Sequence, residues 1–124
     1  MAKKNTTYGK ADKQTSYVSG YLRVPKTARS GATLSGGKGD LQDEFSLFEC
    51  KTMMSEQASF SVKKEWLTKA NKERVEERRQ FSFLVINFGG LPSQDNHVVM
   101  SLEDFRNMYN VYKEHVRDDD YKED

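Results

Sequence analysis

The sequence predicts an α/β fold in which a small mixed β-sheet is flanked by helices. Phe81–Phe88 (FSFLVINF) is the most apolar segment of the 124 residues and predicts a central strand. Phe45–Lys51 (FSLFECK) is dominated by aromatic residues and predicts a second strand. Amphipathic patterns near residues 61–79 and 102–116 predict two helices, so strands and helices alternate along one domain.

The first 44 residues carry weaker signals. Tyr17–Val24 fits either a helix or a strand, and Pro25 ends it. Residues 26–39 hold four glycines and several hydroxyl side chains, which indicates a loop long enough to be functional. Leu41 falls in a short first strand, and residues 42–44 form the turn into the next one.

The two predicted helices each have a start signal. Ser61 is a plausible N-cap for a helix to about Arg79, with an apolar face that includes Trp66. His97–Met100 forms a short edge strand, and Ser101 then caps the second helix. The apolar residues of that helix are expected in the core; they are Leu102, Phe105, Tyr109, Tyr112 and Val116.

Charge divides the chain into three parts: a basic, flexible arm at 1–16, a single domain at 17–117 and an acidic tail at 118–124. The net charge is +1, but residues 1–39 hold eight basic residues and one acid. Such a segment can follow a phosphate backbone or simply be solvated. No membrane-length apolar run or secretory signal is evident, so we expect a cytoplasmic protein, in the host cytoplasm if it is phage-encoded.

The residues that suggest chemistry are Asp40, Glu49 and Lys51. In a strand, residues 49 and 51 project to the same face, and Asp40 can fold back toward them from the preceding hairpin strand. Two carboxylates and the backbone carbonyl of Cys50 form an oxygen site for Mg²⁺, with Mn²⁺ as a substitute. A lysine beside that ion could position water or neutralise charge at phosphorus. The lone cysteine excludes an intramolecular disulfide framework and an ordinary cysteine-based zinc site.

These motifs resemble the PD-(D/E)xK nuclease superfamily, and most closely its phage and archaeal Holliday-junction-resolvase-like endonucleases. The similarity covers 28–90 and includes RSGA (29–32), GKGD (37–40), ECK (49–51), SFSV (59–62) and FLVINFGG (83–90). It implies a restriction-endonuclease-like core, Mg²⁺, a branched DNA substrate of recombination and a homodimer.

The same resemblance implies roles for individual residues. Asp40 and Glu49 would be metal ligands and Lys51 the catalytic lysine, with Ser30 and Gly31 near the scissile phosphate. The chain departs from the pattern because Gly39 replaces a proline and because residues 1–43 contain no glutamate, whereas these resolvases carry one on an N-terminal helix. Asp12 is the acid available there, and Gln14 is a neutral candidate.

Basic side chains around this motif could contact DNA. Arg29 and Lys38 could meet phosphates from the glycine-rich loop, while Lys69 and Lys72 form either a phosphate-contacting ridge or a solvated helix face. The sequence therefore predicts a Mg²⁺-dependent DNA endonuclease. A non-catalytic nucleic-acid-binding protein that keeps the nuclease fold remains the alternative, and a small structural or inhibitory phage-type protein is a third reading.

Overall fold

The computed structural model describes residues 7–27 and 38–122 of the chain. In chain order, these residues form α1 (Thr7–Leu22), β1 (Leu41–Gln42), β2 (Ser46–Thr52), α2 (Lys64–Glu76), β3 (Phe81–Asn87), β4 (Asn96–Val99) and α3 (Leu102–Lys122). None of the helices in the described ranges is both long and apolar enough to cross a membrane.

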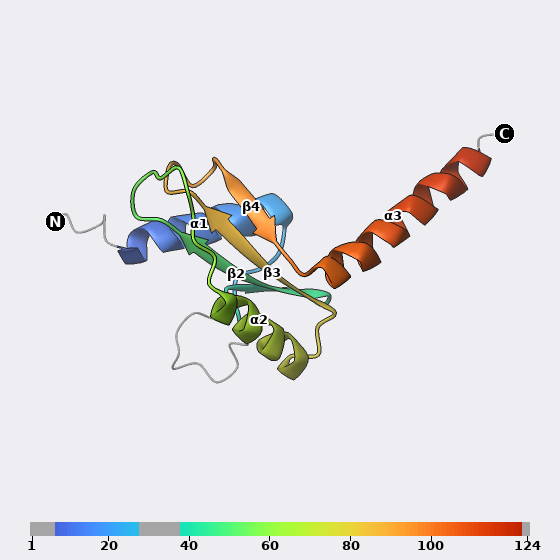
Figure 1. Ribbon diagram of the computed structural model, residues 1–124, viewed down its shortest axis with the longest axis horizontal. Helices are drawn as coiled ribbons and strands as arrows, with labels where there is room; N and C mark the ends of the chain where they lie inside the picture. The colour runs from blue at the N-terminus through green and yellow to red at the C-terminus, as the bar shows by residue number, and fades with distance from the viewer. Residues whose placement is uncertain (1–6, 28–37, 123–124) are drawn as a thin grey trace.

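The four strands form one mixed sheet in the order β1-β2-β3-β4. The outer pairs are antiparallel, whereas β2 and β3 are parallel. A parallel pair needs a crossover connection, and α2 provides it. Helices α1 and α2 lie on opposite faces of the sheet (Figure 1). The predicted α/β class with a mixed sheet flanked by helices is therefore confirmed.

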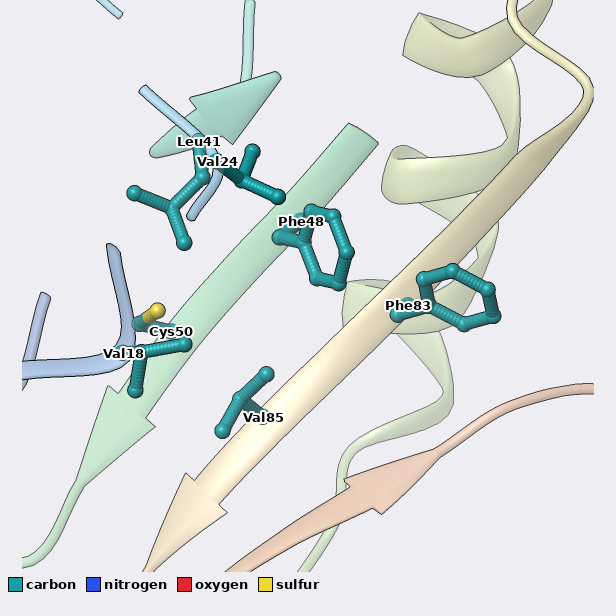
Figure 2. Close-up of a cluster of buried hydrophobic side chains, with 7 residues drawn as sticks. All are labelled: Val18, Val24, Leu41, Phe48, Cys50, Phe83 and Val85. Carbon is teal, nitrogen blue, oxygen red and sulfur yellow. The ribbon is translucent and has the colours of Figure 1, made fainter. Parts of the chain in front are cut away.

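The main apolar core lies between the sheet and α1. The cluster consists of Val18, Val24, Leu41, Phe48, Cys50, Phe83 and Val85 (Figure 2). The parallel register places Phe48 beside Phe83, with ring centroids 5.1 Å apart, and Cys50 beside Val85. Since side chains alternate along a strand, the residues between them face α2.

Helix α1 corrects the prediction of a flexible arm for residues 7–16, while residues 1–6 of that arm lie outside the described residues. It begins at Thr7, and both Gln14 and Thr15 are buried. The Lys10 ammonium donates a hydrogen bond to the Gly89 carbonyl at 2.6 Å. The segment is polar and weakly amphipathic, so its helical structure depends on tertiary contacts that periodicity does not show.

Helix α2 begins three residues after the predicted N-cap, Ser61, and ends at Glu76 rather than Arg79. Lys63 is the N-cap and makes no side-chain capping hydrogen bond. Phe60 packs edge-on against the rings of Trp66 and Phe88, at 6.1 Å from each. These contacts anchor the segment before the helix, which explains its later start.

Helix α3 begins after Ser101, as predicted, but it does not pack against the sheet. The backbone N–H of Asp104 donates to the Ser101 hydroxyl at 3.0 Å, which confirms the cap. The predicted core residues are instead exposed, from Leu102 at 81% to Val116 at 37%, because α3 projects away from the sheet (Figure 1). Residues 118–122, the described part of the predicted acidic tail, continue this helix.

Candidate active site

The site begins where the pairing of β1 with β2 ends. Gly39 has φ +78°, and a Cβ at this position would lie 2.8 Å from Cγ of Leu47, so both conformation and space favour glycine. The next residue, Asp40, donates its backbone N–H to the Phe48 carbonyl at 2.8 Å. Its Oδ2 accepts a hydrogen bond from the Cys50 N–H, also at 2.8 Å.

This second bond fixes the Asp40 carboxylate against the edge of β2. Strand β1 pairs with Leu47 and Phe48, and no other described strand pairs with β2 on that side. The Asp40 side chain therefore satisfies the Cys50 N–H where a backbone partner is missing. The Cys50 carbonyl points to this same edge, because the N–H and C=O of a strand residue share one side.

Glu49 faces α2 and is 8% exposed. Its carboxyl group is hydrogen-bonded to Glu73 of α2, while Glu49 Oε2 is buried without a hydrogen-bond partner. The pKa of Glu49 is raised to about 8, chiefly by burial and then by the hydrogen bond with Glu73 and the charge of Asp40; Lys69 acts in the opposite direction. Without a cation, this carboxyl group is mostly protonated at neutral pH.

Lys51 lies on the same face as Glu49, as the alternation of the strand predicts. Its Nζ is 4.9 Å from the centroid of the Trp66 ring, so α2 also orients this side chain. A cation over an aromatic face is attracted by the ring quadrupole. Asp40 thus lies at the edge of β2, and Glu49 and Lys51 share the face of this strand that is turned toward α2.

Helix α2 adds two residues that the sequence analysis did not assign to the metal site. Glu73 contacts Glu49, and Lys69 Nζ lies 3.6 Å from Glu73 Oε2. Glu73 Oε1 is buried without a hydrogen-bond partner, like Glu49 Oε2. The sequence held a signal for this position, because Trp66, Ala70 and Glu73 follow the i, i+4, i+7 spacing of one helix face.

The N-terminal acid candidate does not join this group. Asp12 is exposed on α1, and α1 covers the opposite face of the sheet. Gln14 is buried there and donates its side-chain N–H to the Val85 carbonyl at 3.3 Å. The charges that act on Glu49 come from Asp40, Glu73 and Lys69 instead.

Three of the six predicted DNA-contacting residues, Lys38, Lys69 and Lys72, lie in the described part of the chain, on or beside α2. Arg29, Ser30 and Gly31 lie outside the described residues. Lys38 Nζ is 3.1 Å from Glu76 Oε1, and this pairing raises the pKa of Lys38. Lys72 is exposed on α2.

The thiol of Cys50 is separated from the carboxylates by the strand itself. It faces α1, near the Thr15 hydroxyl, and burial raises its pKa to about 12. A thiol with that pKa remains protonated at neutral pH and is a poor nucleophile. Cys50 therefore contributes its backbone to the site and its side chain to the core.

The donor set suits a hard divalent cation that retains water ligands. Within residues 7–27 and 38–122, no three His, Cys, Asp or Glu side chains form a group that could hold a metal ion. Mg²⁺, however, commonly binds through one or two carboxylates and completes its shell with water and substrate phosphate. Asp40, Glu49 and the Cys50 carbonyl could supply such a partial shell, and a cation would satisfy the unpartnered Glu49 Oε2.

Comparison of the chain with protein-family models, curated proteins and solved structures gives no match. The function is therefore inferred from the residues and geometry of the site itself.

Proposed function

We propose that the chain is a Mg²⁺-dependent DNA endonuclease of the PD-(D/E)xK type that hydrolyses phosphodiester bonds in branched DNA such as Holliday junctions. The supporting observation is that Glu49 and Lys51 share one face of β2, beside an Asp40 carboxylate held at the edge of that strand. A mixed sheet with a helix on each face and a crossover through α2 agrees with a restriction-endonuclease-like core.

Each residue of the site then has a distinct role. Asp40, Glu49 and the Cys50 carbonyl would hold Mg²⁺, which when bound lowers the pKa of a water ligand and offsets charge on the phosphodiester. Lys51 would position the attacking water or stabilise negative charge at phosphorus. Lys69 would favour the ionised form of Glu49 that a metal needs.

DNA would approach the α2 side of the sheet edge, where the site lies. Lys72 is exposed on that helix, and Lys38 is held beside it by Glu76. Cationic side chains near a scissile phosphate supply binding energy that does not depend on base sequence. The preference for branched DNA is carried over from the sequence resemblance.

Metal dependence tests the proposal directly. A four-way junction and a linear duplex of matched sequence should be incubated with the full chain in Mg²⁺, Mn²⁺, Ca²⁺ or chelator. We expect cleavage of the junction in Mg²⁺ and Mn²⁺, binding with poor turnover in Ca²⁺ and no cleavage in chelator.

Asp40→Asn should abolish that cleavage, because the amide weakens the metal site while the chain still folds. Asp43→Asn is the matched control: Asp43 Oδ1 caps the neighbouring turn by accepting from Phe45 and Ser46, and asparagine keeps that oxygen. Cleavage that persists in chelator, or an Asp40→Asn variant as active as Asp43→Asn, would contradict the proposal.

A non-catalytic nucleic-acid-binding protein is the second candidate, and one observation favours it. Helix α1 brings no acid beside Glu49, and Glu49 itself is mostly protonated at neutral pH when no metal is bound. Under this alternative, the chain binds the junction but leaves it uncut with every metal, and Lys51→Ala binds as tightly as the unaltered chain.

A further inference from the structure

Four aromatic side chains form a continuous row on the α2 side of the sheet. Phe60 packs against Trp66 and against Phe88, with ring centroids 6.1 Å apart in each pair. Phe88 in turn contacts the ring of His97, at 5.8 Å. The aromatic row, Trp66, Phe60, Phe88 and His97, therefore runs from α2 to the edge strand β4.

The aromatic row begins at the candidate active site. Lys51 Nζ lies 4.9 Å from the centroid of the Trp66 ring. Lys51 is paired with Ile86 of β3, and Ile86 is paired with His97 of β4, so these three residues share one face of the sheet. A phosphate held at Lys51 would therefore have the row directly beside it, where the adjoining nucleotides of the same strand would lie.

The rings of the row are open to solvent, unlike those of the core. Trp66, Phe60 and Phe88 are half-buried, and the His97 side chain is 60% exposed. The two phenylalanines of the α1 face, Phe48 and Phe83, are each only 7% exposed. The row thus packs the segment before α2 against the sheet and still offers ring surface to a ligand.

The cationic groups near the row gather at its Trp66 end. Lys51 and Lys63 both lie over the Trp66 ring, with Nζ at 4.9 and 5.8 Å from its centroid. Lys63 is exposed and precedes the first turn of α2, so its flexible side chain can move aside when a planar group stacks on the ring. This end of the row therefore suits a ligand that combines flat rings with negative charge.

The neighbouring acidic groups do not face the Trp66 ring. Glu65 precedes Trp66 on α2, and successive residues of a helix project about 100° apart. The Glu56 carboxylate lies beside Gly90, beyond the end of β3. Asp95 Oδ1 is 3.8 Å from His97 Nε2, at the far end of the row. A polyanion is accordingly favoured at the end of the row that adjoins Lys51.

We propose that the aromatic row stacks unpaired bases of the strand being cut, so that DNA with unpaired nucleotides beside the scissile phosphate is cut in preference to a fully paired junction. The position of the cut in this inference rests on the proposed nuclease function. Aromatic side chains stack on any base, because every base has a π-face. In a duplex, the neighbouring base pairs cover these faces, so only unpaired nucleotides, as in a splayed arm or a flap, can use the row.

Stacking can be measured apart from cleavage, because Trp66 is the only tryptophan of the chain. The full chain should be titrated in chelator and low salt with a thymidine oligonucleotide, with an abasic oligonucleotide of equal phosphate number, and with a blunt duplex. We expect the thymidine oligonucleotide to quench the tryptophan fluorescence and the other two to change it little. Quenching no stronger with the thymidine oligonucleotide than with the abasic one would show phosphate contact alone and overturn the proposal.

Trp66→Leu and Trp66→Phe separate stacking from packing, since both keep an apolar side chain at this position. Binding is followed in chelator by the fluorescence anisotropy of a labelled splayed-arm DNA. Trp66→Leu should raise the dissociation constant about 10-fold, the loss expected for one stacked base, while Trp66→Phe should keep most of the affinity. Tyr112→Ala, which removes an exposed aromatic ring from α3, is the control and should bind like the unaltered chain. Equal dissociation constants for Trp66→Leu and Trp66→Phe would overturn the proposal.

Cleavage in Mg²⁺ tests the substrate preference. At DNA concentrations below saturation, the unaltered chain should cut the splayed arm about 10-fold faster than a four-way junction of matched sequence, because the row binds only the former's unpaired bases. Equal rates would overturn the preference and leave the nuclease function standing. Absence of cleavage of either DNA would instead contradict the proposed nuclease function, and the quenching titration would still decide whether the row stacks bases.

Discussion

The two faces of β2 have opposite chemistry. Phe48 and Cys50 face α1 within a closed apolar cluster (Figure 2). Glu49 and Lys51 alternate with them and face α2, where carboxylate oxygens of Glu49 and Glu73 are buried without hydrogen-bond partners. A buried polar oxygen without a hydrogen-bond partner costs free energy of folding. Gln14 Oε1 on the α1 side is one such atom, but the ionisable ones belong to Glu49 and Glu73 on the α2 side, where a bound cation would satisfy Glu49 Oε2.

Lys51→Ala should produce the largest effect on the α2 face. Loss of one group that stabilises charge in the transition state lowers cleavage by about 100- to 1000-fold. The free energy of unfolding should change by only about 0.5–1 kcal/mol, the usual contribution of a cation over an exposed aromatic ring. Junction cleavage in Mg²⁺ and urea unfolding measure the two effects.

Lys63→Ala is the control for this substitution. Lys63 Nζ lies 5.8 Å from the centroid of the same Trp66 ring, but Lys63 precedes α2 and is not on β2. Its removal should change stability by a similar amount and leave cleavage intact. Equal losses of cleavage in the two variants would mean that contact with Trp66, rather than proximity to Glu49, determines the effect.

Glu49→Gln should remove a pH dependence of stability. Below the ordinary glutamate pKa of 4.5, Glu49 is protonated in both the folded and the unfolded chain. Between pH 4.5 and about 8, the unfolded chain loses this proton while the folded chain keeps it. The metal-free chain therefore loses stability as pH rises through this window. At pH 8, Glu49→Gln should be more stable than the unaltered chain by roughly 4 kcal/mol, since raising the pKa from 4.5 to about 8 corresponds to about 1.4 kcal/mol for each pKa unit.

Urea unfolding in chelator at pH 5 and pH 8 measures this difference, and Glu44→Gln, at an exposed turn position, is the control. Mg²⁺ should raise the melting temperature of the unaltered chain at pH 8 and have little effect on Glu49→Gln. A steeper loss of stability with pH in Glu49→Gln than in the unaltered chain would contradict the assignment of this carboxyl group.

The sequence predicted the strands better than the helices. Phe81–Phe88 and Phe45–Lys51 match β3 and β2 closely, because a buried strand requires a short apolar run that is visible locally. Helix α1 was missed because its polar sequence is held by long-range contacts, such as that of Gln14 with the Val85 carbonyl. The periodicity of α3 was correct, but periodicity alone does not reveal whether a partner surface lies within the same chain.

The part of the site that lies on or beside β2 could be predicted from the sequence. The alternation along β2 placed Glu49 and Lys51 together, and the hairpin brought Asp40 to the same edge. Glu73 belongs to a helix more than 20 residues away, and its contact with Glu49 depends on how α2 packs on the sheet. Sequence spacing gives the face of a helix, but not the strand residue that this face meets.

Cys50→Ala should have the smallest effect of these substitutions. It gives the sharpest test of whether the α1 face of β2 acts only in stability and the α2 face only in cleavage. The substitution removes a buried sulfur from the α1 cluster, so the free energy of unfolding should fall by about 1 kcal/mol. Cleavage should be unchanged, because the Cys50 N–H that binds Asp40 belongs to the backbone and is kept by alanine. The thiol faces Thr15 rather than Glu49, and its pKa of about 12 leaves it uncharged at neutral pH. Urea unfolding and junction cleavage should therefore respond independently, with a measurable loss in the first and none in the second. A folded Cys50→Ala chain without cleavage would show that the apolar face of β2 takes part in the chemistry, and the division between the two faces would fail.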